Sequence, residues 1–284
     1  MNPKRADRIA TVVFWSLSMT TLAALLVIIV RILSKGLLKA LNPFFVFGKP
    51  EALKAGGGVL PMVVSTLYIT VLTVVIAFPI ALATAIYLAE YTRRESRLTR
   101  VIRLCIDTLA SLPSIVFGLF GMSLFVIFLG WGYSLVAGAA TLAVLSLPVI
   151  ARSAEESIRS VPDTYREASY SLGASKWTTI RQVVLPSAFP GVITGTILAI
   201  GRIIGESAAV IYTAGLFVRK IPLNPLRTGA PLSAYIWYAQ AEARIPDFRS
   251  VVDGGAALLL IIVLLVNFVA RKLASYYREK KIAG

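Results

Sequence analysis

The chain of 284 residues contains no histidine and only one cysteine, Cys105. A zinc-type site needs several His or Cys ligands, and a disulfide within the chain needs two cysteines, so both are excluded. The sequence also lacks the Gly-x4-Gly-Lys-Ser/Thr phosphate loop, the dinucleotide glycine fingerprint and the hydrolase nucleophile elbow. We therefore expect no catalytic residue, no metal site and no cofactor on this chain, and no binding of ATP.

Charged residues are scarce as well. They make up 15% of the chain, against 57% hydrophobic residues and a mean hydropathy of +0.78. These values exclude an ordinary soluble domain and indicate an integral membrane protein. Acids number 14 and bases 29, which gives a net charge of +15. Most bases flank apolar runs, where they set topology in the lipid, so we expect no nucleic-acid partner.

Six apolar runs are close to the ~20 residues that cross the hydrocarbon of a bilayer. We expect spans at residues 10–33, 62–89, 105–129, 132–151, 190–215 and 254–275. The first apolar run has no small-residue cleavage site, so it is interpreted as a retained span and not a removed signal peptide. An even number of spans puts both termini on one side of the membrane.

The basic residues predict which side that is. Segments 1–9, 93–103, 152–181 and 271–281 carry 18 of the 29 bases, and the six-span topology puts all four on the same face. By the positive-inside rule this face, with both termini, is cytoplasmic.

The outer segments are also cationic. This charge could attract an anionic solute or an acidic partner, although solvated loop charge is the more common explanation. Segment 231–244 carries three aromatic residues and is typical of a helix lying at the outer headgroups. The outer bases are Lys35, Lys39, Lys49, Lys54, Arg219, Lys220, Arg227, Arg244 and Arg249.

Prolines interrupt four of the spans. Each removes a backbone donor, so kinks are expected at Pro79, Pro113, Pro148 and Pro190. Such kinks occur in bundles that move, but proline is also simply tolerated in membrane helices.

The polar loop between the fourth and fifth spans contains signals for one short helix. Pro162-Asp163 is a helix start, and Gly173 is a stop. Such a helix would present Tyr165, Ala168, Ser169 and Leu172 to the groove of a partner. The alternative is an ordinary amphipathic connector lying on the inner leaflet.

The same loop carries a long, gapped pattern, and its members are Glu167-Ala168-Ser169, Gly173, Val183 and Leu185-Pro186. The pattern resembles the EAA signature of permease subunits of ABC importers, with Ser169 in place of the second Ala and Val183 in place of Ile. The resemblance implies an all-α, six-span permease of the type I (MetI-like) fold. It also implies a coupling helix that docks into a cytoplasmic ATPase, which alone binds ATP and Mg.

Two charged residues, Arg202 and Glu206, are predicted to lie in the middle of the fifth span. A charge there costs about 2.5–3.5 kcal/mol, so such residues are functional candidates by default. The spacing predicts that they lie one helical turn apart on the same face, which Gly195, Ala199 and Ala209 extend with small side chains.

Two interpretations of this pair stay open. Arg202 could offer bidentate donors to a passing oxyanion while Glu206 holds the guanidinium and limits the affinity. Alternatively, the pair could be a buried ion pair that locks helix packing, supported by Gly191/Gly195 and Gly201/Gly205 at small-x3-small spacing.

Three further segments narrow the resemblance to permeases of phosphate-specific ABC importers, the PstA type. They are Gly57-Gly58-Val59-Leu60-Pro61 with Ser65-Thr66-Leu67-Tyr68, Leu112 to Gly121, and Gly201-Arg202-x-x-Gly205-Glu206. The resemblance implies that Arg202 and Glu206 belong to the substrate path.

The same resemblance implies partners in the inner membrane of a prokaryote. These are a second permease (PstC type), two copies of an ATPase (PstB type), an extracytoplasmic phosphate-binding protein (PstS type) and inorganic phosphate. The domains expected are an N-terminal helix with an outer segment at 1–61, a transmembrane domain at 62–275 with its coupling loop at 152–189, and a cytoplasmic tail at 276–284.

Two alternatives for function stay open. One is a permease for another oxyanion such as sulfate or molybdate, because one arginine does not distinguish tetrahedral anions by charge. The other is a self-contained channel or ion-coupled carrier, which leaves the pattern from Glu167 to Pro186 unexplained.

Overall fold

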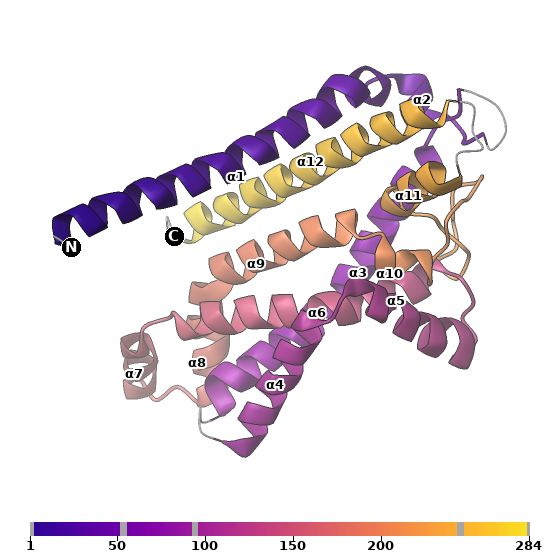
Figure 1. The fold of residues 1–284 in the computed structure, drawn as a ribbon. Helices are drawn as coiled ribbons and strands as arrows, with labels where there is room; N and C mark the ends of the chain where they lie inside the picture. Colours follow the sequence, from indigo (N-terminus) through magenta and orange to yellow (C-terminus); the bar gives the residue numbers. More distant parts are fainter. Residues whose placement is uncertain (1–2, 52–55, 93–95, 243–246, 283–284) are drawn as a thin grey trace.

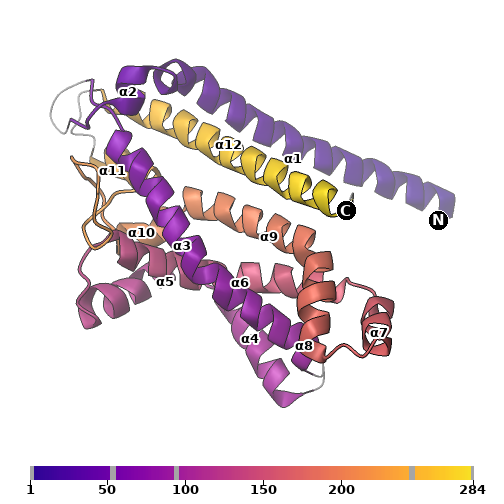
Figure 2. The same ribbon diagram turned by 180° about the vertical axis from the view of Figure 1, so that it is seen from behind.

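The computed structural model describes residues 3–51, 56–92, 96–242 and 247–282. Within these ranges all regular elements are helical (Figures 1 and 2). They are α1 (Pro3–Ala40), α2 (Pro43–Phe47), α3 (Leu60–Ile86), η1 (Tyr87–Tyr91), α4 (Arg97–Ser111), α5 (Ser114–Gly121), η2 (Met122–Phe128), α6 (Leu135–Arg159), α7 (Asp163–Ser171), α8 (Lys176–Thr179), η3 (Ile180–Val184), α9 (Leu185–Gly205), α10 (Ala208–Ile211), α11 (Leu232–Glu242) and α12 (Phe248–Ile282), where η marks π-helical turns. The predicted all-α architecture is confirmed.

Five helical segments are long and apolar enough to cross a membrane. They are Asp7–Ala40, Leu60–Tyr91, Leu135–Arg159, Lys176–Gly205 and Phe248–Lys272. They correspond to five of the six predicted spans. Within the predicted coupling loop at 152–189, α6 runs on to Arg159 and helix resumes at Lys176.

The predicted third span at 105–129 is broken at Pro113, where a kink was expected, into two helical segments that together are long and apolar enough to cross a membrane. α4 and the α5–η2 segment are bent by 101° relative to each other. Leu112 and Pro113 at the break have extended backbone, with ψ of 139° and 141°. Because Pro113 has no N–H and disfavours helical backbone in the residue before it, the helix stops there. The helices continue through Pro79, Pro148 and Pro190, so kinks at those positions stay a prediction.

The centre of the bundle is formed by α3, α6 and α9, which meet through small side chains. Ala77, Ala81, Ala143, Ala151 and Ala199 lie in one buried cluster of these three helices. Small residues let helix backbones approach closely, which strengthens van der Waals packing where lipid supplies no hydrophobic driving force.

Glycines extend this contact between α6 and α9. A Cβ added at Gly195 would overlap the side chain of Ser153, and one at Gly191 would lie 2.5 Å from the Oγ of Ser157. The small-residue interpretation is therefore correct for this glycine pair, which lies against α6.

The first and last helices pack along each other at one side of the bundle (Figure 1), and α12 also packs on α9. They cross closely at Gly36, where an added Cβ would overlap the carbonyl of Asp253. Ile32 and Leu33 join the buried cluster around Val251 and Leu258. No residue in the most apolar 18-residue window of α1 is buried within the chain, so most of this helix is left exposed by this subunit.

The predicted helix at 231–244 is α11, and its aromatic residues point two ways. Tyr235 is 2% exposed and packs on Phe217, with ring centroids 6.1 Å apart, whereas Trp237 is half exposed. Burial, together with the charge of Asp247, raises the pKa of Tyr235 to about 12, so its hydroxyl stays neutral at physiological pH. Only part of this aromatic set is free to meet headgroups.

Both chain ends lie at the same end of the molecule as α7 and α8, and α2 and α11 lie at the opposite end (Figures 1 and 2). This agrees with the predicted topology, and the assignment of the cytoplasmic side stays a prediction. Arg93, Arg94, Lys54 and Arg244, which entered the charge argument, lie outside the described residues.

Replacing Gly195 with Ala should destabilise the permease, because the new methyl group overlaps Ser153. We expect a loss of about 1–3 kcal/mol, the usual cost of overpacking a core. Thermal unfolding of the detergent-solubilised protein measures it. Gly205→Ala is the matched control, since nothing lies within 4 Å of its added Cβ. Equal stability of the two variants would contradict the close α6–α9 contact.

Candidate functional site

The loop helix predicted from the polar pattern is α7. Its start at Asp163 follows Pro162, which has extended backbone, and Gly173 follows its end with a φ of +81°. A left-handed φ is nearly free for glycine and costly for most other residues, so Gly173 lets the chain turn back. The predicted start and stop of this helix are confirmed.

The exposed face of α7 carries most of the predicted docking residues. Glu167 and Ala168 are exposed, Tyr165 is half exposed, and Leu172 is 89% exposed. Trp177 of α8 adds a second exposed aromatic side chain. The loop therefore presents large apolar side chains to solvent, which is typical of a surface that binds a partner.

The placement of Ser169 on this docking face is wrong. Its side chain is buried and its Oγ lies 2.9 Å from the Oγ1 of Thr179 in the short helix α8. Ser169 therefore fastens α7 to α8 from the inside, because a buried hydroxyl needs a hydrogen-bond partner.

A buried ion pair attaches α7 to the bundle. The Nη2 and Nε atoms of Arg166 lie 2.7 and 3.1 Å from Glu90 Oε1 at the end of the α3–η1 segment. The two side chains are only 14% and 6% exposed. Arg166 also donates to the carbonyl oxygens of Ile158 and Val161 and pairs with Asp163 at 3.1 Å.

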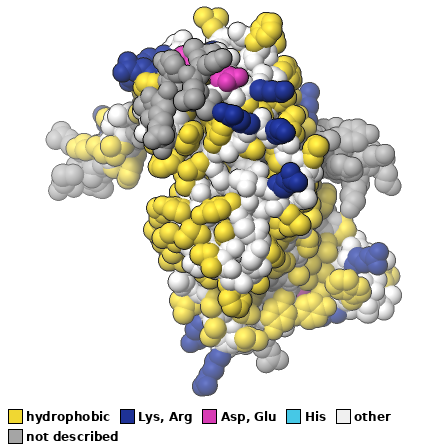
Figure 3. Space-filling model, turned by 90° about the vertical axis from the view of Figure 1, so that its right-hand side faces the viewer, with side chains coloured by type: hydrophobic (Ala, Val, Ile, Leu, Met, Phe, Trp, Pro, Cys, Tyr) yellow, Lys and Arg dark blue, Asp and Glu magenta, His cyan; other side chains and the backbone are white. Residues whose placement is uncertain are grey.

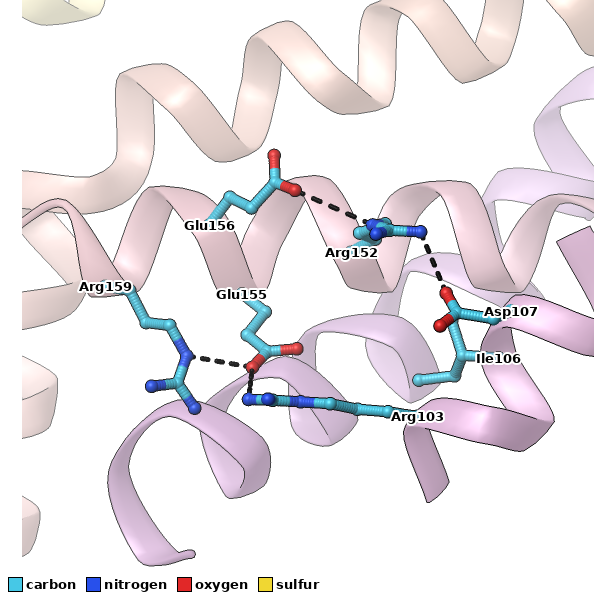
Figure 4. Close-up of a pocket in the computed structure, with 7 residues that line it drawn as sticks. All are labelled: Arg103, Ile106, Asp107, Arg152, Glu155, Glu156 and Arg159. Atoms are coloured by element: carbon cyan, nitrogen blue, oxygen red, sulfur yellow. Dashed lines mark hydrogen bonds and ion pairs between the residues drawn. The ribbon is translucent and has the colours of Figure 1, made fainter. Parts of the chain in front are cut away.

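A second charged network, shown in Figure 4, joins α4 to α6. Glu155 Oε1 accepts from Arg103 at 2.6 Å and from Arg159 at 2.8 Å, and Arg152 pairs with Asp107 at 2.8 Å. Arg159 also donates to the carbonyl of Leu88 in η1.

These side chains line a polar pocket of about 250 Å³. Three arginines there face the three acids Asp107, Glu155 and Glu156, so the charges balance. The network therefore holds α4 against α6, and it has no surplus positive charge with which to bind an anion.

The sequence prediction missed both networks. The Glu155–Arg159 pair has the i,i+4 spacing that sequence reveals. Arg166 and Glu90 are 76 residues apart, and nothing in the sequence links them.

Leu185 and Pro186, the end of the predicted pattern, lie at the start of α9 and away from the exposed face of α7. Leu185 packs on the buried cluster that contains Val184 and Ala188, while Pro186 occupies the first turn of the helix. Pro186 has no N–H to donate, and it directly follows the π-helical turn η3 inside the continuous helical segment Lys176–Gly205. These two residues support the loop without extending its surface.

The prediction that Arg202 and Glu206 lie on one continuous helix is wrong. α9 ends at Gly205, and Glu206 has extended backbone with a ψ of 121°. The Glu206 carboxylate accepts from the N–H of Ala208 at 3.1 Å, and its carbonyl accepts from the hydroxyl of Ser233 at 2.8 Å. Glu206 therefore satisfies backbone and hydroxyl groups at a break between α9 and α10.

Arg202 lies on an exposed stripe of α9 with Thr194 and Leu198. Among the described residues its guanidinium makes no hydrogen bond or ion pair, so the predicted pair with Glu206 is not formed. Gly195 and Ala199 point the other way, into α6. The predicted small-residue face and the face of Arg202 are thus different faces, and the interpretation of a buried locking pair is contradicted.

The sequence segments singled out around the charged pair converge in space. Phe117 and Ile203 belong to one buried cluster, and Tyr68 packs against it. Gly118 lies against α10, where an added Cβ would be 3.0 Å from the Ala208 carbonyl. Thr66 Oγ1 accepts from the N–H of Leu232 at 2.9 Å.

A polar side chain that the sequence prediction missed lies beside this break. Asn267 is the only polar residue in the apolar run 256–270. A Cβ on Gly201 would lie 3.3 Å from its Nδ2, and its Oδ1 is buried without a partner among the described residues. A lone polar residue in an apolar span is a signal that could have found it.

Comparison with known proteins identifies the family. The sequence profile described as "Binding-protein-dependent transport system inner membrane component" matches residues 78–281. The chain belongs to this family. It is 39% identical over the full length of both chains to the "Probable ABC transporter permease protein YqgI" of Bacillus subtilis. It is 35% identical to the "Phosphate transport system permease protein PstA" of Pasteurella multocida, over 86% of this chain and 85% of that one.

The fold comparison agrees. A solved bacterial alginate ABC transporter, in complex with its alginate-bound periplasmic protein, matches with a TM-score of 0.64 at 14% identity, over 92% of this chain and 95% of that one. The predicted type I importer fold is confirmed. The permease is a multi-pass inner-membrane subunit of an ABC importer and a non-catalytic component of the pore. ATP is hydrolysed by its partner ATPase, and a binding protein delivers the solute.

Replacing Glu90 with Gln should weaken both the permease fold and its association with the ATPase. Arg166 would keep a buried charge that has lost its buried acid partner and retains only the exposed Asp163, and breaking a buried pair costs about 3–5 kcal/mol. Thermal unfolding and co-purification of the ATPase measure the two effects. Asp163→Asn is the matched control, because that partner of the same guanidinium is 86% exposed and its pair is worth at most about 1 kcal/mol. Similar losses in both variants would contradict the anchoring role of Glu90.

Proposed function

We propose that this chain is a permease subunit of an ATP-driven phosphate importer and forms one half of the translocation path. Its partners would be a second permease of the PstC type, two ATPases of the PstB type and a phosphate-binding protein of the PstS type. Both termini and α7 would face the cytoplasm. The observation that carries the proposal is Arg202, which is exposed beside the break after α9 and makes no ion pair within the described part of the chain.

The physical argument starts from the cost of that charge. An arginine facing lipid at mid-membrane costs about 2.5–3.5 kcal/mol, so an exposed guanidinium on an apolar helix must face a watery path or a partner subunit. A guanidinium offers parallel donors that match two oxygens of a tetrahedral oxyanion. Free of a counter-charge, Arg202 is available to such an anion.

Glu206 and Asn267 complete the proposed site in different ways. The Glu206 carboxylate is occupied by the backbone at the break, so it shapes the path and places a negative charge near it. That charge would keep the anion from binding too tightly to be released. Asn267 adds a neutral amide on the neighbouring helix α12, beside Gly201.

The choice of solute rests on relatives. A phosphate permease matches over most of both chains at 35% identity, whereas the full-length relative at 39% carries only a generic permease name. Sulfate or molybdate is therefore the alternative, because the same guanidinium would serve any tetrahedral oxyanion. Membership of the importer family removes the basis for a self-contained channel or carrier.

On the cytoplasmic side, we propose that Glu167, Ala168, Leu172 and Gly173 form the contact with the ATPase. Their exposure at the tip of an anchored helix supports this role. Ser169, Leu185 and Pro186 would act indirectly by holding the loop in shape.

Replacing Arg202 with Gln should reduce phosphate uptake at least tenfold, because a charged double hydrogen bond to the anion is lost. Radiolabelled uptake by proteoliposomes that contain the complete importer and its binding protein measures this. Arg202→Lys should retain more uptake than Gln, and Arg271→Gln, an exposed arginine at the end of the apolar part of α12, should behave as wild type. Normal uptake in Arg202→Gln would refute the path role. Competition by unlabelled sulfate or molybdate, but not phosphate, would select the alternative solute.

Replacing Gly173 with Asp should abolish association with the ATPase while the permease remains inserted. The new carboxylate would stand next to Leu172 on the docking face. Gly130→Asp is the matched control, because Gly130 also has a positive φ, +69°, with open space around it. Both variants should carry the same strain, on the order of 1–3 kcal/mol. Retention of the ATPase by Gly173→Asp in a pull-down would remove the coupling assignment.

A further inference from the structure

A second surface lies at the end of the molecule opposite α7. Segments 131–133 and 218–228 form a hollow of about 760 Å³. Its walls are mostly apolar and include Trp131, Tyr133, Leu223 and Leu226, with Lys220 and Arg227 among them. We call this surface the outer hollow. None of its residues belongs to a helix long enough to cross the membrane.

The outer hollow is held in shape by backbone hydrogen bonds. The N–H groups of Leu135 and Val136, at the start of α6, donate to the carbonyls of Arg227 and Pro225 at 3.1 and 3.0 Å. Thr228 Oγ1 donates to the carbonyl of Tyr133 at 3.0 Å, which joins the two walls. These bonds use N–H groups that a helix start leaves free. A surface preorganised in this way loses little entropy on binding.

The side chains that this loop exposes are large. Leu223 is 89% exposed and Leu226 60% exposed, and Trp131 stacks on Phe125 at the rim with ring centroids 5.4 Å apart. A concave group of aromatic and aliphatic side chains with basic residues beside it has the composition of an interface core with a polar rim.

The charge around the outer hollow has one sign. Segments 129–134 and 207–241 contain the cations Arg219, Lys220 and Arg227 and not one Asp or Glu. In Figure 3, which views this end of the molecule, Lys and Arg side chains are far more visible than Asp and Glu. Complementarity therefore selects an acidic partner.

We propose that the outer hollow binds the importer's extracytoplasmic binding protein. The lobe that enters it would carry acidic residues around exposed apolar side chains. Lys220 and Arg227 would steer the acidic lobe, and Leu223 and Trp131 would supply the buried contact. The proposal rests on the proposed import function but not on phosphate as the solute. An anionic lipid surface would also meet cations, but a lipid surface does not need a concave seat.

The test uses the complete importer in nanodiscs, with its binding protein titrated in and ATP hydrolysis as the readout. Lys220→Glu/Arg227→Glu should raise the binding-protein concentration that gives half-maximal stimulation about tenfold at low salt. The rate at saturating binding protein and the basal rate should be unchanged, which shows an intact complex. Raising the salt concentration should shrink the difference between variant and wild type, because exposed charges are screened.

Leu223→Ala should raise the same concentration about tenfold, independently of salt, since it removes a buried apolar contact. Arg249→Glu, an exposed outer cation outside the hollow, is the control and should have no effect. Unchanged half-maximal concentrations in both hollow variants would overturn the proposal. An effect seen only in nanodiscs with anionic lipid would assign the hollow to lipid instead and also overturn it. If sulfate in place of phosphate supports transport, the solute assignment fails while the docking proposal stands.

Discussion

The buried pair of Arg166 and Glu90 makes α7 part of the membrane bundle. A guanidinium this buried cannot stay without a counter-charge, so α7 keeps its place on the α3–η1 segment and on the end of α6. Glu155 does the same for α4 through Arg103, and Arg159 on the same helix as Glu155 pairs with the same carboxylate. Any displacement of the loop must therefore be passed to three helices at once. This is the mechanical property that a coupling element needs.

The path from the loop to the charged site is one nearly unbroken helix. The segment from Lys176 to Gly205 contains 30 residues, or about 45 Å at 1.5 Å per residue. It starts beside α7, where Ser169 bonds Thr179, and ends one turn after Arg202. Tight packing of Gly191 and Gly195 on α6 prevents this helix from sliding independently. Movement at the loop would therefore reach Arg202 as a rigid-body movement of the segment Lys176–Gly205 together with α6.

Two helix breaks meet at the far end of this segment. One break lies between α4 and α5 at Pro113, and the other follows α9 at Gly205. The two meet because α5 packs on α10 through Gly118. Backbone groups freed by a break at membrane depth need new partners, and Glu206 and Ser233 provide them. Irregular backbone of this kind is tolerated only where protein or water covers it, which is consistent with a position beside a path.

Apolar length and local turn chemistry act between near neighbours, so the membrane class, the approximate spans, the α7 helix with its glycine stop and the family resemblance could be predicted from the residues. The directions in which side chains point, and the distant charges that meet, followed only from the packing of the helices. Ser169 proved internal because α8 folds beneath it, and Arg202 does not pair with Glu206 because the helix ends before that residue. The Arg166–Glu90 contact joins residues 76 apart, and burial against a distant partner leaves no local pattern to read.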